Sequence, residues 1–185
     1  MRGTSRLLAA LTAAARAITL GACTGSKESG CTTNPDGVIE CPPDARTPAP
    51  PVKGELLDGT PYDLAAARGN VVVLNFWGSW CAPCRAEIDD LENMYLATKD
   101  SGVDFLGING RDGRDQAMAF QQGRVTYPSL FDPGGRTSLD FDVPPNSTPS
   151  TIVLDRAGRI AVVVRNAIRQ DAFQPYVERI AAEAS

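Results

Sequence analysis

The residues best suited to chemistry are two cysteines separated by two residues, in Trp80-Cys81-Ala82-Pro83-Cys84. They follow a nearly continuous apolar run over 71–76, which predicts a buried strand, and they precede a stretch with helical character. At the start of a helix, backbone N–H groups and the helix dipole stabilise a thiolate, lowering its pKa below the free value of about 8.5. We therefore predict a redox pair in which Cys81 attacks a substrate disulfide and Cys84 resolves the mixed disulfide.

Two other roles for this cysteine pair are weaker. A zinc ribbon needs a second C-x-x-C, and the sequence has none. A purely structural disulfide would not need a position between a buried strand and a helix, whereas C-x-x-C near a β-α-β pattern is a specific sign of redox chemistry. We expect no metal and no cofactor.

The composition removes several other kinds of chemistry. There is no histidine, which excludes Ser-His-Asp hydrolysis, Cys-His proteolysis and His-ligated metal sites. The formal net charge is −4, and an acidic chain is a poor partner for nucleic acid. A hydrophobic content of 43% over 185 residues predicts one packed domain with additional segments.

Residues 1–22 have the pattern of an export signal, with a basic start, a short apolar run and small residues at its end. The run is too short to span a bilayer, which takes about 20 apolar residues, and Arg16 interrupts it. Leu20-Gly21-Ala22-Cys23 resembles the lipobox of bacterial lipoproteins, in which the cysteine becomes the lipidated N-terminus. We predict a lipid anchor at Cys23, with a plain secretory signal as the alternative.

Residues 23–53 are rich in Ser, Gly, Thr, Pro and Asp, a composition typical of a flexible tether rather than a core. This stretch contains Cys31 and Cys41. If Cys23 carries lipid, these two cysteines form an even pair in an oxidising compartment, which favours a structural disulfide. Zinc is the alternative, although two lone thiols do not complete a tetrahedral site. The folded domain is predicted over 54–185.

The domain alternates strand-like and helix-like patterns, which predicts a mixed sheet with helices on both faces. Asp58-Gly59 lies at the centre of a predicted hairpin over 54–64. Further strands are predicted over 71–76, 103–108, 151–154 and 160–164, and helices over 82–97, 115–122, 136–141 and 171–184.

Residues 71–87, VVVLNFWGSWCAPCRAE, resemble the active-site region of the TlpA/ResA group within the thioredoxin superfamily. The similarity extends over most of residues 54–180. It implies an α/β, thioredoxin-like fold, with a central mixed β-sheet flanked by helices on both faces and an N-terminal β-hairpin extension. It also implies a thiol–disulfide oxidoreductase, since this group contains exported, often membrane-tethered proteins with a W-C-x-P-C centre.

The resemblance assigns a substrate-binding role to Thr148 and Pro149, which match the residue pair with a cis-proline that faces the thiols in this superfamily. The backbone of Thr148 would then pair with an extended substrate. The alternative is an ordinary turn proline. Trp80 flanks the cysteines and is expected to add an apolar contact surface, and the loop over 143–148 is longer than in ResA-like proteins.

Glu87 lies three residues after Cys84, near the same face of the predicted helix. The matching glutamate in ResA-like proteins lies close to the thiols and influences their proton transfer. The alternative is an ordinary solvent-facing glutamate. Asn75 stands where thioredoxins proper carry a buried aspartate, and its amide does not titrate, so Glu87 is the better proton-transfer candidate.

The role implied by the resemblance is exchange between the C-x-x-C pair and protein thiols or disulfides outside the cytoplasmic membrane. Its commonest form is reduction of apocytochrome c before haem attachment, with electrons from a membrane thiol–disulfide carrier. The expected location is the outer face of the cytoplasmic membrane through a lipid anchor, or secretion if the lipobox is not used. The alternatives are an oxidase for exported proteins, a peroxide-reducing redoxin, and a redox-inert binding lipoprotein.

Overall fold

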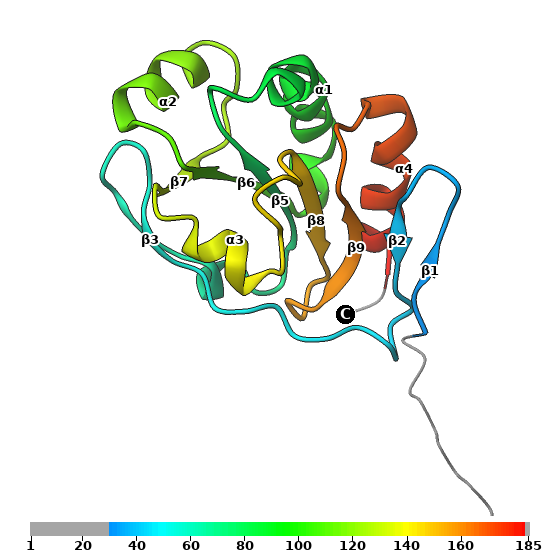
Figure 1. Cartoon of the computed structure of the whole chain (residues 1–185). Coiled ribbons are helices and arrows are strands. Elements are labelled where there is room, and N and C mark those ends of the chain that lie inside the picture. Colours follow the sequence, from blue (N-terminus) through cyan, green and yellow to red (C-terminus); the bar gives the residue numbers. More distant parts are fainter. Residues whose placement is uncertain (1–29, 184–185) are drawn as a thin grey trace, which may run out of the picture.

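The computed structural model describes residues 30–183, shown in colour in Figure 1. The predicted signal segment 1–22 and the predicted lipid anchor at Cys23 lie outside the described residues. Within the described range, no helix is long and apolar enough to cross a membrane.

A seven-stranded mixed sheet forms the centre of the molecule. In spatial order its strands are β1 (Thr32–Thr33), β2 (Ile39–Glu40), β9 (Ile160–Val164), β8 (Ser150–Leu154), β5 (Val71–Trp77), β6 (Val103–Gly110) and β7 (Ser129–Asp132). β5, β6 and β7 run parallel, whereas β8 is antiparallel to both β5 and β9. This arrangement confirms the expected mixed α/β architecture.

Helices and a hairpin cover the sheet on its two faces (Figure 1). The helices of the described range are α1 (Ala82–Thr98), α2 (Arg114–Gln121), α3 (Arg136–Asp140) and α4 (Gln170–Ala181), with short 3₁₀ helices η1 (Leu64–Ala67) and η2 (Lys99–Ser101). The hairpin consists of β3 (Lys53–Glu55) and β4 (Pro61–Asp63), as the Asp58-Gly59 pattern predicts.

The central strand β5 shows why the core has two layers. All seven of its residues are buried, as in a strand covered on both faces. Val71 and Val73 belong to a cluster completed by α1 and α4 residues such as Leu91 and Phe173. Alternate β5 residues, including Leu74, point to the opposite face, where the hairpin region and the α3 end pack. The sheet thus holds the carboxyl end of β5 rigidly between two apolar layers.

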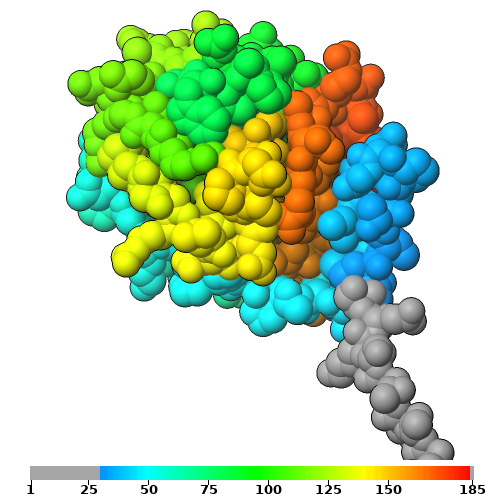
Figure 2. All heavy atoms as spheres, viewed as in Figure 1, coloured from blue at the N-terminus to red at the C-terminus, as the bar shows by residue number. Residues whose placement is uncertain are grey.

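Residues 30–53 differ from the expected tether. β2 pairs antiparallel with β9, and Cys31 forms a disulfide with Cys41. Val38 and Val52 are buried, with 8% and 2% exposure. In Figure 2 this segment, blue to cyan, lies directly against the orange β9. Most of residues 30–53 faces solvent, in keeping with their polar composition. A few apolar side chains and backbone pairing with the open edge of β9 are enough to order the segment.

Arg46 holds this segment to the far end of the sheet. Its guanidinium donates to Asp155 Oδ2 at 3.2 Å and to both carboxylate oxygens of Glu183, and its Nε donates to the Cys41 carbonyl at 3.0 Å. The Arg46 side chain is only 2% exposed. The hydrogen bonds to Glu183 outweigh desolvation and raise the pKa of Arg46. The folded unit therefore includes residues 30–53, and does not begin at Gly54.

Candidate active site

The carboxyl end of β5 delivers the redox pair. After Trp77 the chain turns through Gly78-Ser79-Trp80, and α1 begins directly after Cys81. The Cys81 N–H donates to the Gly78 carbonyl at 3.1 Å, which closes the turn. A Cβ at Gly78 would lie 2.4 Å from the indole nitrogen of Trp80, so a side chain at this position would displace the Trp80 ring.

Cys81 and Cys84 form a disulfide across the first turn of α1. Cys81 is the N-cap residue of the helix, and its Sγ accepts a hydrogen bond from the Cys84 N–H at 3.2 Å. Both residues are buried, at 3% and 2% exposure. When the pair is reduced, this N–H group and the helix dipole favour a thiolate at position 81.

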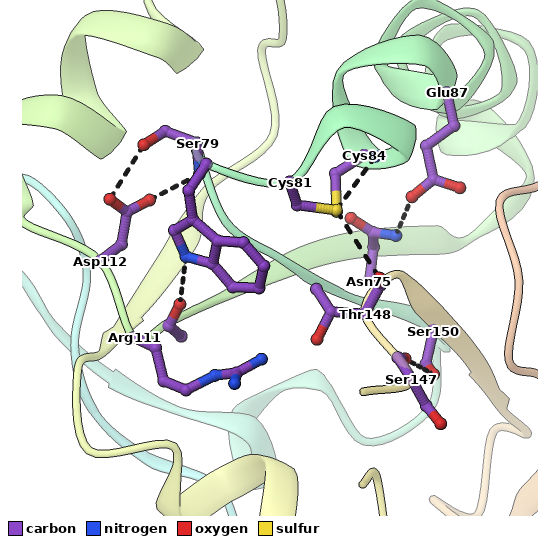
Figure 3. The surroundings of a disulfide bond; sticks show 12 residues. Asn75, Ser79, Cys81, Cys84, Glu87, Arg111, Asp112, Ser147, Thr148 and Ser150 are labelled. Atoms are coloured by element: carbon purple, nitrogen blue, oxygen red, sulfur yellow. Dashed lines mark hydrogen bonds between the residues drawn. A yellow bond between two sulfur atoms is a disulfide. The ribbon is translucent and has the colours of Figure 1, made fainter. Parts of the chain in front are cut away.

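The peptide bond between Thr148 and Pro149 is cis, and it faces the redox pair. The carbonyl oxygen of Thr148 lies 3.7 Å from Cys81 Sγ (Figure 3). This segment leads directly into β8, which pairs with β5, so the sheet fixes both sides of the contact. An extended polypeptide lying along residue 148 would therefore come within reach of Cys81.

Glu87 does not face solvent. It is 1% exposed, and its carboxylate accepts hydrogen bonds from Asn75 Nδ2 at 2.9 Å and from the Ile168 N–H at 2.8 Å. Burial raises its pKa from 4.5 to about 7, against the opposing effect of the two hydrogen bonds. The carboxyl group therefore changes its charge near neutral pH, as a proton donor or acceptor in this range must.

Asn75 connects Glu87 to the interior behind the disulfide. Its Nδ2 also donates to Thr151 Oγ1 at 3.2 Å, which fixes the amide between β5 and β8. Together with Cys84 and Tyr127, Asn75 lines a small internal cavity of about 10 Å³. The amide of Asn75 does not titrate itself, but it orients the Glu87 carboxyl group, which does.

The two tryptophans near the site have different environments. Trp77 is buried, and its indole N–H donates to Ser129 Oγ at 3.2 Å. Trp80 is 49% exposed, and its indole N–H donates to the Gly110 carbonyl at 3.3 Å. The Arg111 guanidinium lies 4.8 Å from the centre of the Trp80 ring. Trp80 is therefore the tryptophan that offers an apolar face beside the thiols.

The loop over 143–148 contributes one wall of a cavity of about 100 Å³ next to the site. The cavity reaches from Trp77 to Leu139 on α3 and ends at Thr148. Leu139 is 63% exposed. The resemblance to ResA-like proteins implies a long loop here, and in the structure its prolines line the cavity.

Asp112 contacts the turn before Cys81, a role that was not predicted from the sequence. Its carboxylate accepts hydrogen bonds from the turn before Cys81, at Ser79 N and Ser79 Oγ (Figure 3). The position could have been found from the sequence, because Asp112 lies two residues after a buried strand parallel to β5, and the carboxyl ends of parallel strands meet at one edge.

The other sequence-predicted residues lie away from this site. Cys31 and Cys41 belong to the β1–β2 hairpin, which is separated from β5 by β9 and β8. Between residues 30 and 183, no group of three or more His, Cys, Asp or Glu side chains is placed to hold a metal ion.

Known proteins are similar to this chain in sequence and fold. The model of the AhpC/TSA family matches residues 45–163. The thiol:disulfide interchange protein HelX of Rhodobacter capsulatus is 34% identical over 138 residues, covering 72% of this chain and 75% of HelX. The thiol-disulfide oxidoreductase ResA of Bacillus subtilis is 28% identical over 124 residues, covering 66% and 68%. A secreted thiol-disulfide isomerase from Corynebacterium glutamicum superimposes with a TM-score of 0.76 at 35% identity, covering 83% of this chain and 100% of that one.

The fold and the C-x-x-C pair at the start of α1 define a thiol–disulfide oxidoreductase with a thioredoxin-like fold. The chain belongs to the AhpC/TSA family, and its named relatives confirm the resemblance to the ResA group.

Proposed function

We propose that this protein is a membrane-tethered reductant of disulfides in exported proteins, and that apocytochrome c is among its substrates. The observation that carries the proposal is the position of Cys81. Its Sγ accepts the Cys84 N–H at the helix start and lies 3.7 Å from the Thr148 carbonyl, on the side where an extended chain would approach. A thiolate held there is activated by the start of the helix, and it attacks a substrate disulfide.

Each side chain of the site has one part in this proposal. Cys81 attacks the substrate disulfide and forms a mixed disulfide, and Cys84 displaces the reduced substrate. Glu87 accepts the proton of a thiol and returns it, through its position three residues along α1 from Cys84. Trp80, Thr148 and Pro149 bind the substrate chain around the attacked sulfur.

The buried Glu87 favours reduction over oxidation. When ionised, its carboxylate disfavours a thiolate nearby and so destabilises the dithiolate form of the pair. A strong oxidant is one whose reduced form is stabilised. A chain with a buried carboxyl group behind its resolving cysteine is therefore expected to have a low reduction potential. Reduction of apocytochrome c is the role that the resemblance to the TlpA/ResA group implies.

The location follows from the predicted export signal and lipid anchor at Cys23. The similar protein from Corynebacterium glutamicum is described as secreted, which supports a place outside the cytoplasm. Because such compartments are oxidising, a reductant needs a membrane thiol–disulfide carrier as its source of electrons. A chain with Cys23→Ala is expected to lose incorporation of labelled palmitate and to leave the membrane fraction, while the unaltered chain retains both.

The reduction potential of the Cys81–Cys84 couple tests the direction. The full chain is equilibrated with dithiothreitol or glutathione buffers, with Cys81→Ser as the control that removes the couple. A value near thioredoxin's, about −270 mV, or lower supports a reductant. A value near about −120 mV would instead support an oxidase for exported proteins. Consumption of peroxide faster than exchange with an apocytochrome peptide would favour a peroxide-reducing redoxin.

A further inference from the structure

The turn that carries Cys81 is tied to the neighbouring strand by a single carboxylate. Asp112 Oδ2 accepts the Ser79 N–H at 2.6 Å, and Asp112 Oδ1 accepts the Ser79 hydroxyl at 2.9 Å. Both hydrogen-bond donors of Ser79 therefore go to one side chain. Ser79 lies two residues before the attacking cysteine, so the position of this carboxylate sets the path of the turn.

The carboxylate is itself fixed from the opposite side. Asn109, at the end of β6 and fully buried, donates from Nδ2 to Asp112 Oδ2 at 3.0 Å, and the Gly113 N–H donates to Oδ1 at 2.9 Å. Arg111, just before it, has a positive φ of 53°, a backbone conformation that a residue other than glycine rarely adopts. The loop after β6 is thus held in an unusual conformation that presents Asp112 to the turn.

We propose that Asp112 is a positioning residue for the redox pair, which holds Ser79 so that Cys81 Sγ stays on the Cys84 N–H at the start of α1. This inference rests on the proposed function of Cys81 as the attacking thiol. The thiolate benefits from the helix only while its sulfur lies on that N–H group. Releasing the turn lets Cys81 move away from it, which lowers the fraction of thiolate at a given pH.

The conservative variant Asp112→Asn separates position from charge. With its amide oxygen in place of Oδ2, asparagine still accepts from the Ser79 N–H and from Asn109, and its amide nitrogen can donate to the Ser79 hydroxyl, which also accepts. The Gly113 N–H loses its acceptor at Oδ1, but both contacts to Ser79 are kept although the negative charge is gone. Asp112→Ala removes all of these hydrogen bonds. Asp115→Asn, an exposed residue near the start of α2, is the matched control for loss of one charge.

The test is the rate at which iodoacetamide alkylates Cys81 in the reduced full chain, measured against pH. For Asp112→Ala we expect the midpoint of the profile to move upward by about one unit, equivalent to roughly a tenfold lower rate on its rising limb. For Asp112→Asn and Asp115→Asn, the alkylation rate should stay within about twofold of that of the unaltered chain. This change is far smaller than the tenfold change that one pH unit represents. Thermal unfolding of each variant is followed in parallel.

Two results would overturn the proposal. One is an unchanged profile in Asp112→Ala. The other is an equal upward shift in Asp112→Asn, which keeps the hydrogen bonds to Ser79; loss of the negative charge alone would move the midpoint downward. If Asp112→Ala does not fold, Ser79→Ala decides, because it removes only the hydroxyl bond and should shift the midpoint upward by a smaller amount; no shift there overturns the proposal. Alkylation does not require a protein substrate, so a failure of the proposed function would appear separately, as absent exchange in the unaltered chain.

Discussion

At the scale of single residues, Cys81 and Cys84 have unequal environments although both are buried. Cys81 caps α1 and faces the Thr148 carbonyl, whereas Cys84 lies one turn inside the helix and lines the internal cavity with Asn75. A substrate sulfur approaching along residue 148 meets Cys81 first. The geometry therefore supports attack by Cys81 and resolution by Cys84.

The first prediction concerns these roles. Cys84→Ser should accumulate mixed disulfides through Cys81, because the resolving thiol is gone and the covalent intermediate persists. Cys81→Ser should accumulate none. Non-reducing electrophoresis of the full chain after incubation with an oxidised substrate peptide shows the adducts. Trapping by Cys81→Ser, rather than by Cys84→Ser, would reverse the assignment.

The second prediction concerns Glu87. Its pKa in the folded protein is about 7, above 4.5 in the unfolded chain, so the folded state holds more protons between these two values. Stability should therefore be highest at low pH and fall as pH rises through this window, by up to about 3 kcal/mol from this group. Glu87→Gln should remove most of that fall and flatten the pH dependence of disulfide exchange near pH 7.

Denaturant unfolding at pH 5 and pH 8 measures the effect. Asp89→Asn on the exposed side of α1 is the matched control, and it should keep the slope of the unaltered chain. If Glu87→Gln and the unaltered chain lose the same free energy of unfolding between the two pH values, Glu87 does not titrate in this range.

At the scale of elements, the β1–β2 hairpin depends on how it is attached. Its pairing with β9 covers two residues, a short ladder with little strength of its own. Arg46 adds a buried connection to Asp155, after β8, and to Glu183, after α4. Asp155 is also bound by Arg159, so this buried carboxylate has two cationic partners.

The third prediction follows from that burial. Arg46→Ala should cost about 3 kcal/mol of unfolding free energy, because it leaves the largely buried Asp155 without one of its cations. Arg179→Ala breaks another ion pair between the same segment and α4, but both partners are more exposed, so it should cost less than about 1 kcal/mol. Equal costs in denaturant unfolding would show that the burial of Arg46 contributes nothing.

At the scale of the whole molecule, one N-terminal segment covers the outer side of β9 and also reaches the opposite edge of the sheet at β7. The β1–β2 hairpin pairs with β9 on one side, and the chain then runs under the sheet to the β3–β4 hairpin (Figure 1). There Leu56 bridges to Leu130, and the Leu57 N–H donates to the Ser129 carbonyl on β7. Covered edges prevent pairing with other chains.

The fourth prediction concerns the Cys31–Cys41 disulfide, which closes a short loop within this segment. Replacing both cysteines with serine should lower the unfolding free energy by roughly 2–3 kcal/mol, because the unfolded chain gains freedom. The reduction potential of the Cys81–Cys84 couple should not change, since β9 and β8 separate the hairpin from the site. A changed reduction potential would show that the two disulfides are energetically coupled.

Much of this architecture is predictable from the sequence because its signals are local. The apolar run before Cys81 predicts a strand covered on both faces, and β5 is buried throughout. The Asp58-Gly59 turn predicts the hairpin of β3 and β4. The C-x-x-C spacing at a strand-to-helix junction predicts the redox pair, and α1 begins where that pattern places it.

Other features were decided only by tertiary contacts. β7 is four residues long, too short for a periodic pattern, and it forms because β6 offers a parallel edge. Residues 30–53 have the composition of a tether, but the open edge of β9 and the buried charge of Asp155 order them. Glu87 gains its pKa of about 7 from burial beneath the loop that contains Ile168, eighty-one residues later. Sequence spacing determines which groups share a helix or strand, whereas desolvation and pairing between distant segments depend on the complete fold.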